Sequence, residues 1–167
     1  MARKAFYSFH YKPDAWRASQ VRSIGVIEGN QVISDNDWEE VTNGGDAAIK
    51  RWIDGQMSGR SCVIVLIGSA TANRKWINYE IIEGWNAGKG VVGIYIHNLK
   101  NVAGSQTLKG GNPFRAISIG NGSNAKNLSS IAKAYDPPFS TSTYVYDHIK
   151  NNIESWVTEA IQIRANN

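Results

Sequence analysis

Apolar residues cluster along the chain in a pattern that predicts a β-sheet with buried strands. Residues 61–68 (SCVIVLIG) and 90–98 (GVVGIYIHN) are almost entirely apolar and rich in β-branched side chains, which is typical of strands covered on both faces. Residues 4–11 (KAFYSFHY) alternate and carry several aromatic side chains, so we predict a further strand there. We predict one more short strand within each of two stretches, 25–34 (GVIEGNQVIS) and 129–135 (SSIAKAY).

Between these strands, apolar residues recur at the three- and four-residue spacing of amphipathic helices. The spacing predicts helices over 15–24, 47–57 and 75–88, and a closing helix with an apolar stripe over 149–161. The expected N-cap of the first helix is Asp14, because a short polar side chain can satisfy the free amide groups of a helix start. Gly88 is expected to end the third helix.

Two segments lack either periodicity and are predicted to be loops. Residues 35–46 (DNDWEEVTNGGD) are mostly polar and are expected to form a long loop that closes on a helix cap at Asp46. Residues 99–138 are rich in Gly, Asn and Ser around a short apolar stretch at 115–119. Both segments are therefore expected to connect elements of the fold without belonging to its layers.

The order of strands and helices predicts an α/β fold with a parallel sheet. We expect residues 1–167 to form a single domain, a flavodoxin-like three-layer sandwich with strand order 2-1-3-4-5 and helices on both faces. Ligands of this architecture bind outside the carboxyl ends of the strands, where the first and third strands are neighbours. His10, Tyr11, Ser69 and Glu80 are therefore expected to lie near one crevice.

Composition and charge give no indication of a nucleic-acid-binding, membrane or secreted protein. The net charge of +4 comes from lysines and arginines that are scattered among acids, so nucleic-acid binding is not indicated. No apolar run approaches the roughly 20 residues of a membrane span, and the first residues do not resemble a signal peptide. We expect a cytoplasmic protein that does not bind membranes. Cys62 lies within an apolar run and is interpreted as a core residue.

Several common catalytic and nucleotide-binding motifs are excluded. The G-x-G-x-x-G pattern at 88–93 follows a predicted helix and enters a strand, whereas the dinucleotide fingerprint must follow a strand and open a helix. No phosphate-binding G-x-x-x-x-G-K-[ST] motif is present. A phospho-receiver would need an acid where this chain has Gly68 and Ser69. The histidines have too few partners for a metal site or a Cys/His pair.

Trp38 and Glu80 each allow two interpretations. Trp38 follows Asp37 in a polar run, where its ring either stacks on a base or a nicotinamide or folds back as an anchor of the loop. Glu80 lies one residue before the apolar pair 81–82, at the boundary of the buried helix face. It is either a solvated surface residue or the carboxylate of an active site.

The spacing of Ser69, Trp76, Glu80 and Ile81, together with the aromatic stretch 4–11, resembles TIR domains, in which a Trp-x-x-x-Glu helix follows the third strand. Longer stretches are similar to the TIR-like proteins of the bacterial Thoeris anti-phage system, of the ThsB type. These stretches are 14–30, 34–54, 89–100 and the NPF at 112–114.

Catalytic members of this family cleave the bond between nicotinamide and ribose in NAD, and the Thoeris type is associated with a cyclic ADP-ribose isomer that activates a separate effector protein. By position, the resemblance makes Glu80 the catalytic residue and Trp76 its packing support. It implies NAD as substrate, no cofactor, no metal, and a homo-oligomer or TIR assembly. The expected substrate-binding residues are Phe9, His10, Tyr11, Asp37, Trp38, Ser69 and Trp76.

The chain departs from the TIR pattern at two places. Many TIR domains have Cys after the motif Trp, where this chain has Ile77, and the first loop of the family often carries Arg, where it has residues 10–12 (HYK). A lone carboxylate can still suffice, because the nicotinamide of NAD leaves as a neutral molecule and needs no general acid. We expect Glu80 to be ionised during the reaction, with cations or hydrogen-bond donors nearby, and not to lie in a fully apolar pocket that would raise its pKa. The cations available to it, and to a pyrophosphate, are Lys12, Arg74 and Lys75.

Three functions therefore stay open on the sequence. The leading one is an NAD-cleaving signalling enzyme in anti-phage defence. The second is a non-catalytic TIR interaction module that self-associates or binds a partner protein, in which Glu80 is only structural. The third is a nucleotide sensor that binds NAD without turning it over.

Overall fold

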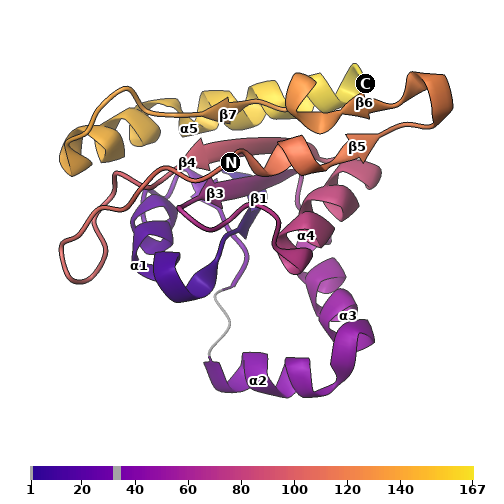
Figure 1. The fold of residues 1–167 in the computed structure, drawn as a ribbon, viewed down its shortest axis with the longest axis horizontal. Coiled ribbons are helices and arrows are strands. Elements are labelled where there is room, and N and C mark those ends of the chain that lie inside the picture. Colours follow the sequence, from indigo (N-terminus) through magenta and orange to yellow (C-terminus); the bar gives the residue numbers. More distant parts are fainter. Residues whose placement is uncertain (1, 32–34) are drawn as a thin grey trace.

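A five-stranded parallel sheet forms the centre of the fold, with helices on both faces (Figure 1). The computed structural model describes residues 2–31 and 35–167, and of residues 35–37 it describes the backbone only. The strand order is β2-β1-β3-β4-β7, which confirms the predicted flavodoxin-like order with β7 in the fifth position. The strands are β1 (Arg3–Ser8), β2 (Ile27–Glu28), β3 (Cys62–Ile67), β4 (Gly90–Tyr95) and β7 (Ala134–Tyr135).

The register of the central strands leaves a step at their carboxyl ends. Ser8, the last residue of β1, pairs with Val65, whereas β3 continues to Ile67, where it pairs with Tyr95 of β4. Every residue of β3 and β4 is buried, as the apolar runs predict. The step leaves the end of β1 short of the end of β3, at the switch point where this architecture binds ligands.

Two apolar clusters pack on the two faces of the sheet. One face is covered by α1 (Tyr11–Arg22) and α5 (Ser142–Ala165), and the other by α3 (Gly45–Met57) and α4 (Lys75–Asn86). Successive residues of one strand contribute to opposite clusters, because side chains alternate across a strand. Phe6 thus packs with α3 and α4, and Tyr7 with α1 and α5.

Most of the predicted helices and strands are confirmed. The helices expected over 47–57 and 75–88 correspond to α3 and α4, and Gly88 follows α4 with a φ of +80°, a conformation that glycine adopts without strain. The apolar stripe over 149–161 lies within α5. The short strand expected within 129–135 is β7, whose Tyr135 stacks on Trp156 of α5 at a centroid distance of 4.5 Å.

The expected role of Asp14 as a helix cap is wrong. The first helix begins at Tyr11 with His10 as its N-cap residue, and Pro13 lies in its first turn, where a missing amide hydrogen costs nothing. Asp14 is therefore inside the helix, buried, and forms a 3.0 Å ion pair with the equally buried Arg17.

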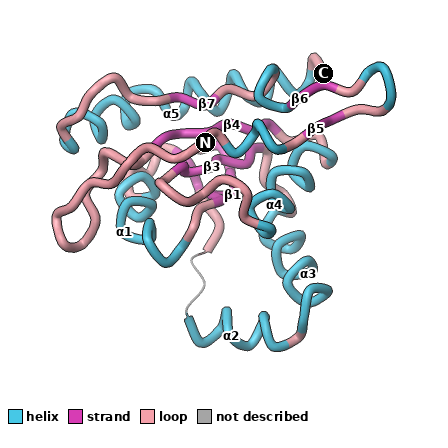
Figure 2. Tube along the Cα trace, viewed as in Figure 1, coloured by secondary structure: helices cyan, strands magenta, loops and turns pink. Residues whose placement is uncertain are grey.

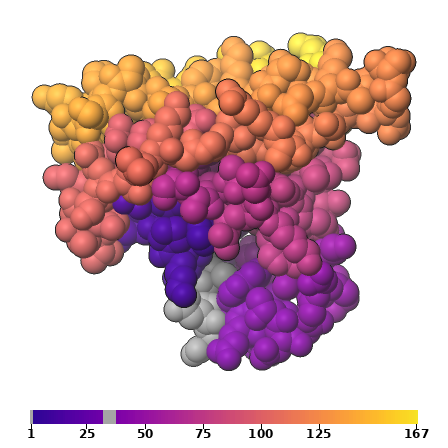
Figure 3. Space-filling model, viewed as in Figure 1, coloured from indigo at the N-terminus to yellow at the C-terminus, as the bar shows by residue number. Residues whose placement is uncertain are grey.

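The polar segment 35–46 is not a loop, contrary to our expectation. It forms the helix α2 (Asp35–Asn43), which continues through a short turn into α3. Trp38 and Val41 lie three residues apart and pack against the apolar cluster on the sheet face that α3 and α4 cover. They give this otherwise polar helix one apolar side. We call α2 and α3 together the arm, residues 35–57; α3 packs on the face of the sheet, and α2 projects from the layers (Figures 1 and 3).

The connection from β4 to β7 consists mostly of loop, as predicted (Figure 2). Its short elements are η1 (Pro113–Ala116), β5 (Ser118–Ile119), η2 (Gly122–Asn124), β6 (Lys126–Asn127) and η3 (Leu128–Ser130). Arg17 holds the start of this connection against α1, because its guanidinium donates to the carbonyl oxygens of Leu99 (2.7 Å) and Ser105 (2.8 Å). In the part of the chain that the structure describes, no helix combines the length and apolarity needed to cross a membrane.

Candidate active site

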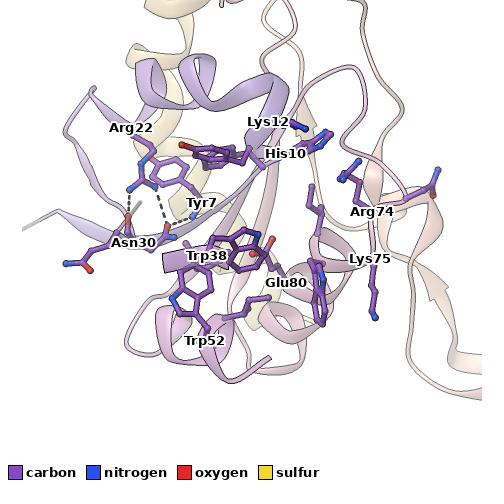
Figure 4. Close-up of a pocket in the computed structure, with 18 residues that line it drawn as sticks. Tyr7, His10, Lys12, Arg22, Asn30, Trp38, Trp52, Arg74, Lys75 and Glu80 are labelled. Atoms are coloured by element: carbon purple, nitrogen blue, oxygen red, sulfur yellow. Dashed lines mark hydrogen bonds between the residues drawn. The ribbon is translucent and has the colours of Figure 1, made fainter. Parts of the chain in front are cut away.

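A cavity of about 900 Å³ opens at the carboxyl end of β1, between the start of α1, the arm and the start of α4 (Figure 4). Its volume lies in the upper part of the range of roughly 300–1,000 Å³ that small-molecule and cofactor sites occupy. Glu80 lies within its wall. The predicted crevice at the switch point is thus present, and it includes the acidic side chain that the sequence singles out.

Glu80 is held by the end of β1. The hydroxyl of Ser8 donates a 2.7 Å hydrogen bond to Oε1 of Glu80, which lies in the second turn of α4. Gly84, one turn further along α4, allows the helix to approach β3 closely, because a Cβ atom there would lie 2.4 Å from a methyl group of Val63. The close approach presses this face of α4 onto the sheet and brings Glu80 within reach of the strand end.

Burial raises the pKa of Glu80 to about 8, and the hydrogen bond from Ser8 opposes this rise. In the free protein the carboxyl group is therefore mostly protonated at neutral pH, which contradicts the expectation that the surroundings of Glu80 do not raise its pKa. The physical reason is the apolar part of the cavity wall, to which Phe6, Ile53 and Ile77 contribute. Such surroundings stabilise the neutral form of a carboxyl group.

Trp76 lies one turn before Glu80 on α4 and lines the same cavity, half-buried. Its ring meets the ring of Tyr79 edge-on at 5.7 Å, and the ammonium group of Lys75 lies 4.8 Å from its ring centre. The Tyr79 hydroxyl donates to the carboxylate of Asp54 on α3, at 3.0 Å. These contacts link the start of α4 to the arm and so fix the wall around Glu80.

The residues that follow β1 form the rim of the cavity, as predicted. Phe9, His10 and Tyr11 all line it, and the rings of Phe9 and Tyr11 lie 6.3 Å apart. Burial lowers the pKa of His10, and the cations Arg74 and Lys12 lower it further against the opposing effect of Asp14. These effects favour the neutral imidazole, and among the described residues its buried Nδ1 has no hydrogen-bond partner.

Trp38 folds back onto the next helix, as one of its two interpretations predicts, and its place in the cavity wall leaves the stacking interpretation as a prediction. It lines the cavity, and it also packs edge-on against Trp52 of α3, with ring centroids 5.6 Å apart and an interplanar angle of 68°. Trp52 is a half-buried cavity residue as well, and it also packs against the apolar cluster that α3 and α4 cover. No sequence signal distinguishes such a residue from a core tryptophan.

Tyr7, Arg22 and Asn30 form another part of the cavity wall that sequence reasoning missed (Figure 4). The Oδ1 of Asn30 accepts a 2.8 Å hydrogen bond from the Tyr7 amide, and Arg22 donates to the Asn30 carbonyl oxygen. The Arg22 guanidinium also lies 5.0 Å from the centre of the Tyr7 ring. Burial raises the pKa of Tyr7 to about 12, so the phenol stays protonated.

Two of the predicted substrate-binding residues are not placed in the cavity. Ser69 is exposed in the turn after β3, does not line the cavity, and has its backbone against Gly110. The side chain of Asp37 lies outside the described part of the chain. Cys62 is buried in β3, which raises the pKa of its thiol to about 12 and makes it a poor nucleophile. Among the described residues, no three metal-ligating side chains gather at one place.

Comparison with known proteins gives two matches. The family model described as "Thoeris protein ThsB, TIR-like domain" matches residues 6–101, a range that includes all the residues that line the cavity. A Bacillus cereus (strain MSX-D12) protein with the name "Putative cyclic ADP-D-ribose synthase ThsB1" is 37% identical over 133 residues, which cover 77% of this chain and 69% of that protein.

Proposed function

Since this chain belongs to the TIR-like domain family of the Thoeris protein ThsB, we propose that it cleaves NAD, releases nicotinamide and forms a cyclic ADP-ribose that acts as a signal in anti-phage defence. The observation that carries the proposal is Glu80, a hydrogen-bonded carboxyl group in the wall of a cavity of about 900 Å³. The name of the Bacillus relative supports the cyclic product.

The reaction requires little acid–base chemistry from the protein. The bond between C1′ of the ribose and the nicotinamide nitrogen breaks, and both of its electrons go to the nicotinamide, which departs neutral. A positive charge then develops on the ribose, and the carboxylate of Glu80 stabilises it as it forms. Ser8 orients this carboxylate through its hydrogen bond, so little reorganisation is needed in the transition state.

Substrate binding converts Glu80 from the protonated to the ionised form that stabilises the ribosyl cation. The nicotinamide ring of NAD is cationic, and an opposite charge a few ångströms from a carboxyl group favours its ionised form. A carboxyl group with a pKa of about 8 therefore loses its proton when the cationic ring arrives beside it. The apolar wall then strengthens the attraction between the two charges, because water does not screen it.

The remaining cavity residues bind and position the dinucleotide. Lys12, Arg74 and Lys75 lie at the rim and are the cations available to the pyrophosphate (Figure 4). Lys75 also forms a 2.5 Å ion pair with Asp46 of α3, so Lys12 and Arg74 carry more of this role. Trp76 supports the wall of the cavity one turn from Glu80. The cyclic product then leaves and activates a separate effector protein.

Product analysis tests the proposal. Purified protein is incubated with NAD, alone and in lysate from infected cells, and nicotinamide and ADP-ribose products are identified by chromatography and mass spectrometry. We expect nicotinamide release by the wild type and a loss of at least 100-fold in Glu80→Gln, which keeps the size and shape of the side chain. If neither condition gives nicotinamide, or if Glu80→Gln retains activity, the enzymatic function is wrong and an interaction module replaces it.

A further inference from the structure

The tryptophans of the arm lie on the other side of Glu80 from the basic rim. In Figure 4, Lys12 lies above Glu80, Arg74 and Lys75 lie to its right, and Trp38 and Trp52 lie to its left. All of these residues line the same cavity. A dinucleotide in this cavity can therefore contact the rim cations, Glu80 and the tryptophans of the arm at the same time.

The geometry of the tryptophan pair suits a flat aromatic ligand. The rings of Trp38 and Trp52 meet edge-on, at 68°, so one ring covers at most one face of the other. Both side chains are half-buried in a cavity wall that also contains Ile53. A nucleobase can stack on such a ring whatever its hydrogen-bonding pattern, because every base presents a π-face.

The arm is held in a defined position relative to Glu80. Asp54 of α3 accepts the hydrogen bond from Tyr79, and Asp46 at the start of α3 pairs with Lys75. Both partners belong to α4, the helix that carries Glu80. A base stacked on the arm would consequently be held at a fixed place with respect to the ribose that reacts at Glu80.

We propose that Trp38 and Trp52 form the subsite for the adenine of NAD, and that they direct the ribosyl cation toward the adenosine half of the same molecule and away from water. This inference rests on the proposed function. A nucleophile held in a productive orientation has an effective concentration of roughly 10⁵–10⁸ M, so it captures the cation before solvent does. The tryptophans thus determine the product, and Glu80 determines the rate.

The two outcomes differ only in the attacking atom. In both, the bond between C1′ and nicotinamide breaks and its electron pair leaves with nicotinamide. In the cyclic outcome, a hydroxyl oxygen of the adenosine half forms the new bond to C1′ and loses its own proton to solvent, or a ring nitrogen of adenine forms the bond and the exocyclic amino group of the base loses one proton. In the hydrolytic outcome, a water oxygen forms that bond and loses one proton, which gives linear ADP-ribose. Neither outcome is a redox reaction.

The first test measures how products partition. Nicotinamide, cyclic ADP-ribose and linear ADP-ribose are quantified for the wild type, Trp38→Ala, Trp52→Ala and Trp38→Phe. We expect each alanine variant to lower the ratio of cyclic to linear product at least tenfold, with both products normalised to the nicotinamide released, and Trp38→Phe to keep the ratio within twofold. The control is Trp16→Ala, because Trp16 is 52% exposed on α1 and does not line the cavity.

The second test measures binding without turnover, by calorimetry with ADP-ribose and with ribose 5-phosphate, which lacks adenine. We expect Trp38→Ala to bind ADP-ribose about tenfold or more weakly and ribose 5-phosphate as the wild type does. Equal losses for both ligands would indicate a deformed cavity and overturn the adenine subsite. An unchanged product ratio, or a wild type that makes linear product only, would overturn the directing role.

The two proposals can fail separately. A wild type that releases no nicotinamide under any condition contradicts the enzymatic function, while the ADP-ribose measurements still decide whether the arm binds adenine. Conversely, a wild type that cleaves NAD while Trp38→Ala and Trp52→Ala bind ADP-ribose normally contradicts the subsite alone. Thermal unfolding of each variant identifies those that do not fold, and for these the phenylalanine substitution provides the comparison.

Discussion

Ser8, the last residue of β1, donates a 2.7 Å hydrogen bond to Oε1 of Glu80 in the second turn of α4, 72 residues later in the chain. The contact joins two elements that are separated by α1, β2, the arm and β3. It orients the carboxyl group toward the cavity and lowers the pKa of Glu80 against the larger effect of burial.

Replacement of Ser8 by alanine tests this relationship. Ser8→Ala removes the hydrogen bond, so the pKa of Glu80 rises further and the acid limb of the pH–rate profile moves to higher pH. We expect roughly a tenfold loss of kcat/KM for NAD at pH 7, the scale of a hydrogen bond to an ionised group, measured as nicotinamide release from pH 6 to 9.5.

The matched control is Ser61→Ala. The Ser61 hydroxyl donates to the carbonyl oxygen of Lys4 at 3.3 Å, at the start of β3 and far from the carboxyl ends of the strands. This variant should keep the profile of the wild type. A Ser8→Ala profile that coincides with the wild-type profile would show that the hydrogen bond has no catalytic role.

Glu80 should also make the stability of the protein depend on pH. Its pKa in the folded protein is about 8, above the ordinary value of 4.5, so the folded state retains a proton that the unfolded chain has already lost. The stabilisation from this proton is complete below pH 4.5 and disappears as the pH rises through 8. In Glu80→Gln the side chain at this position is neutral at every pH, so the variant does not lose this stabilisation as the pH rises.

We therefore compare the free energy of unfolding of Glu80→Gln with that of the wild type at pH 5 and at pH 8.5. We expect this difference to shift in favour of Glu80→Gln by roughly 2–4 kcal/mol when the pH is raised. Urea unfolding followed by tryptophan fluorescence at the two pH values measures the difference. The same difference at both pH values would mean that Glu80 has an ordinary pKa.

NAD binding should release a proton near neutral pH. Glu80 is mostly protonated before binding, because its pKa is about 8, and it ionises beside the cationic nicotinamide ring. The apparent binding enthalpy should then vary between buffers of different ionisation enthalpy, with close to one proton released at pH 7. Glu80→Gln should show no such variation. A wild type whose binding enthalpy is the same in all buffers would contradict this charge change.

The buried pair of Asp14 and Arg17 should be important for stability. Both side chains are almost fully buried, and Arg17 also holds the carbonyl oxygens of Leu99 and Ser105. Asp14→Asn leaves the Arg17 charge without its partner, so we expect a loss of about 3 kcal/mol in the free energy of unfolding. Urea unfolding at pH 7 measures this loss.

The exposed pair of Lys133 and Glu159 serves as the control, since its side chains are 55% and 38% exposed. Lys133→Ala should change the free energy of unfolding by less than about 1 kcal/mol. Similar losses in Asp14→Asn and Lys133→Ala would mean that burial does not determine the contribution of the pair.

The arrangement of the sheet could be predicted from the sequence, because it depends on local patterns. The apolar runs that become β3 and β4 have no polar side to present to water, so they must lie in the middle of the sheet. Once their places are known, the chain order and right-handed crossovers leave few alternatives. The place of Glu80 at the switch point follows from the same reasoning.

Local patterns failed where contacts between distant segments decide the structure. The segment 35–46 has too few apolar residues to predict a helix, yet Trp38 finds an apolar partner in Trp52 on the next helix. Asp14 has the residue type of a helix cap, but its burial beside Arg17 outweighs that preference. Neither partner could be assigned before the layers were assembled.

The amino-acid sequence by itself determined which strands are central, in what order they pair, and which acidic residue lies at their carboxyl ends. Hydrophobic periodicity and the chain order of the elements suffice for the strands, because periodicity reports which side of each element must avoid water, whereas the resemblance to TIR domains singled out Glu80. The tertiary structure alone decided the hydrogen bond from Ser8, the raised pKa of Glu80 and the tryptophan wall opposite the basic rim. These depend on desolvation and on distances between side chains from separate elements, and no local pattern encodes either.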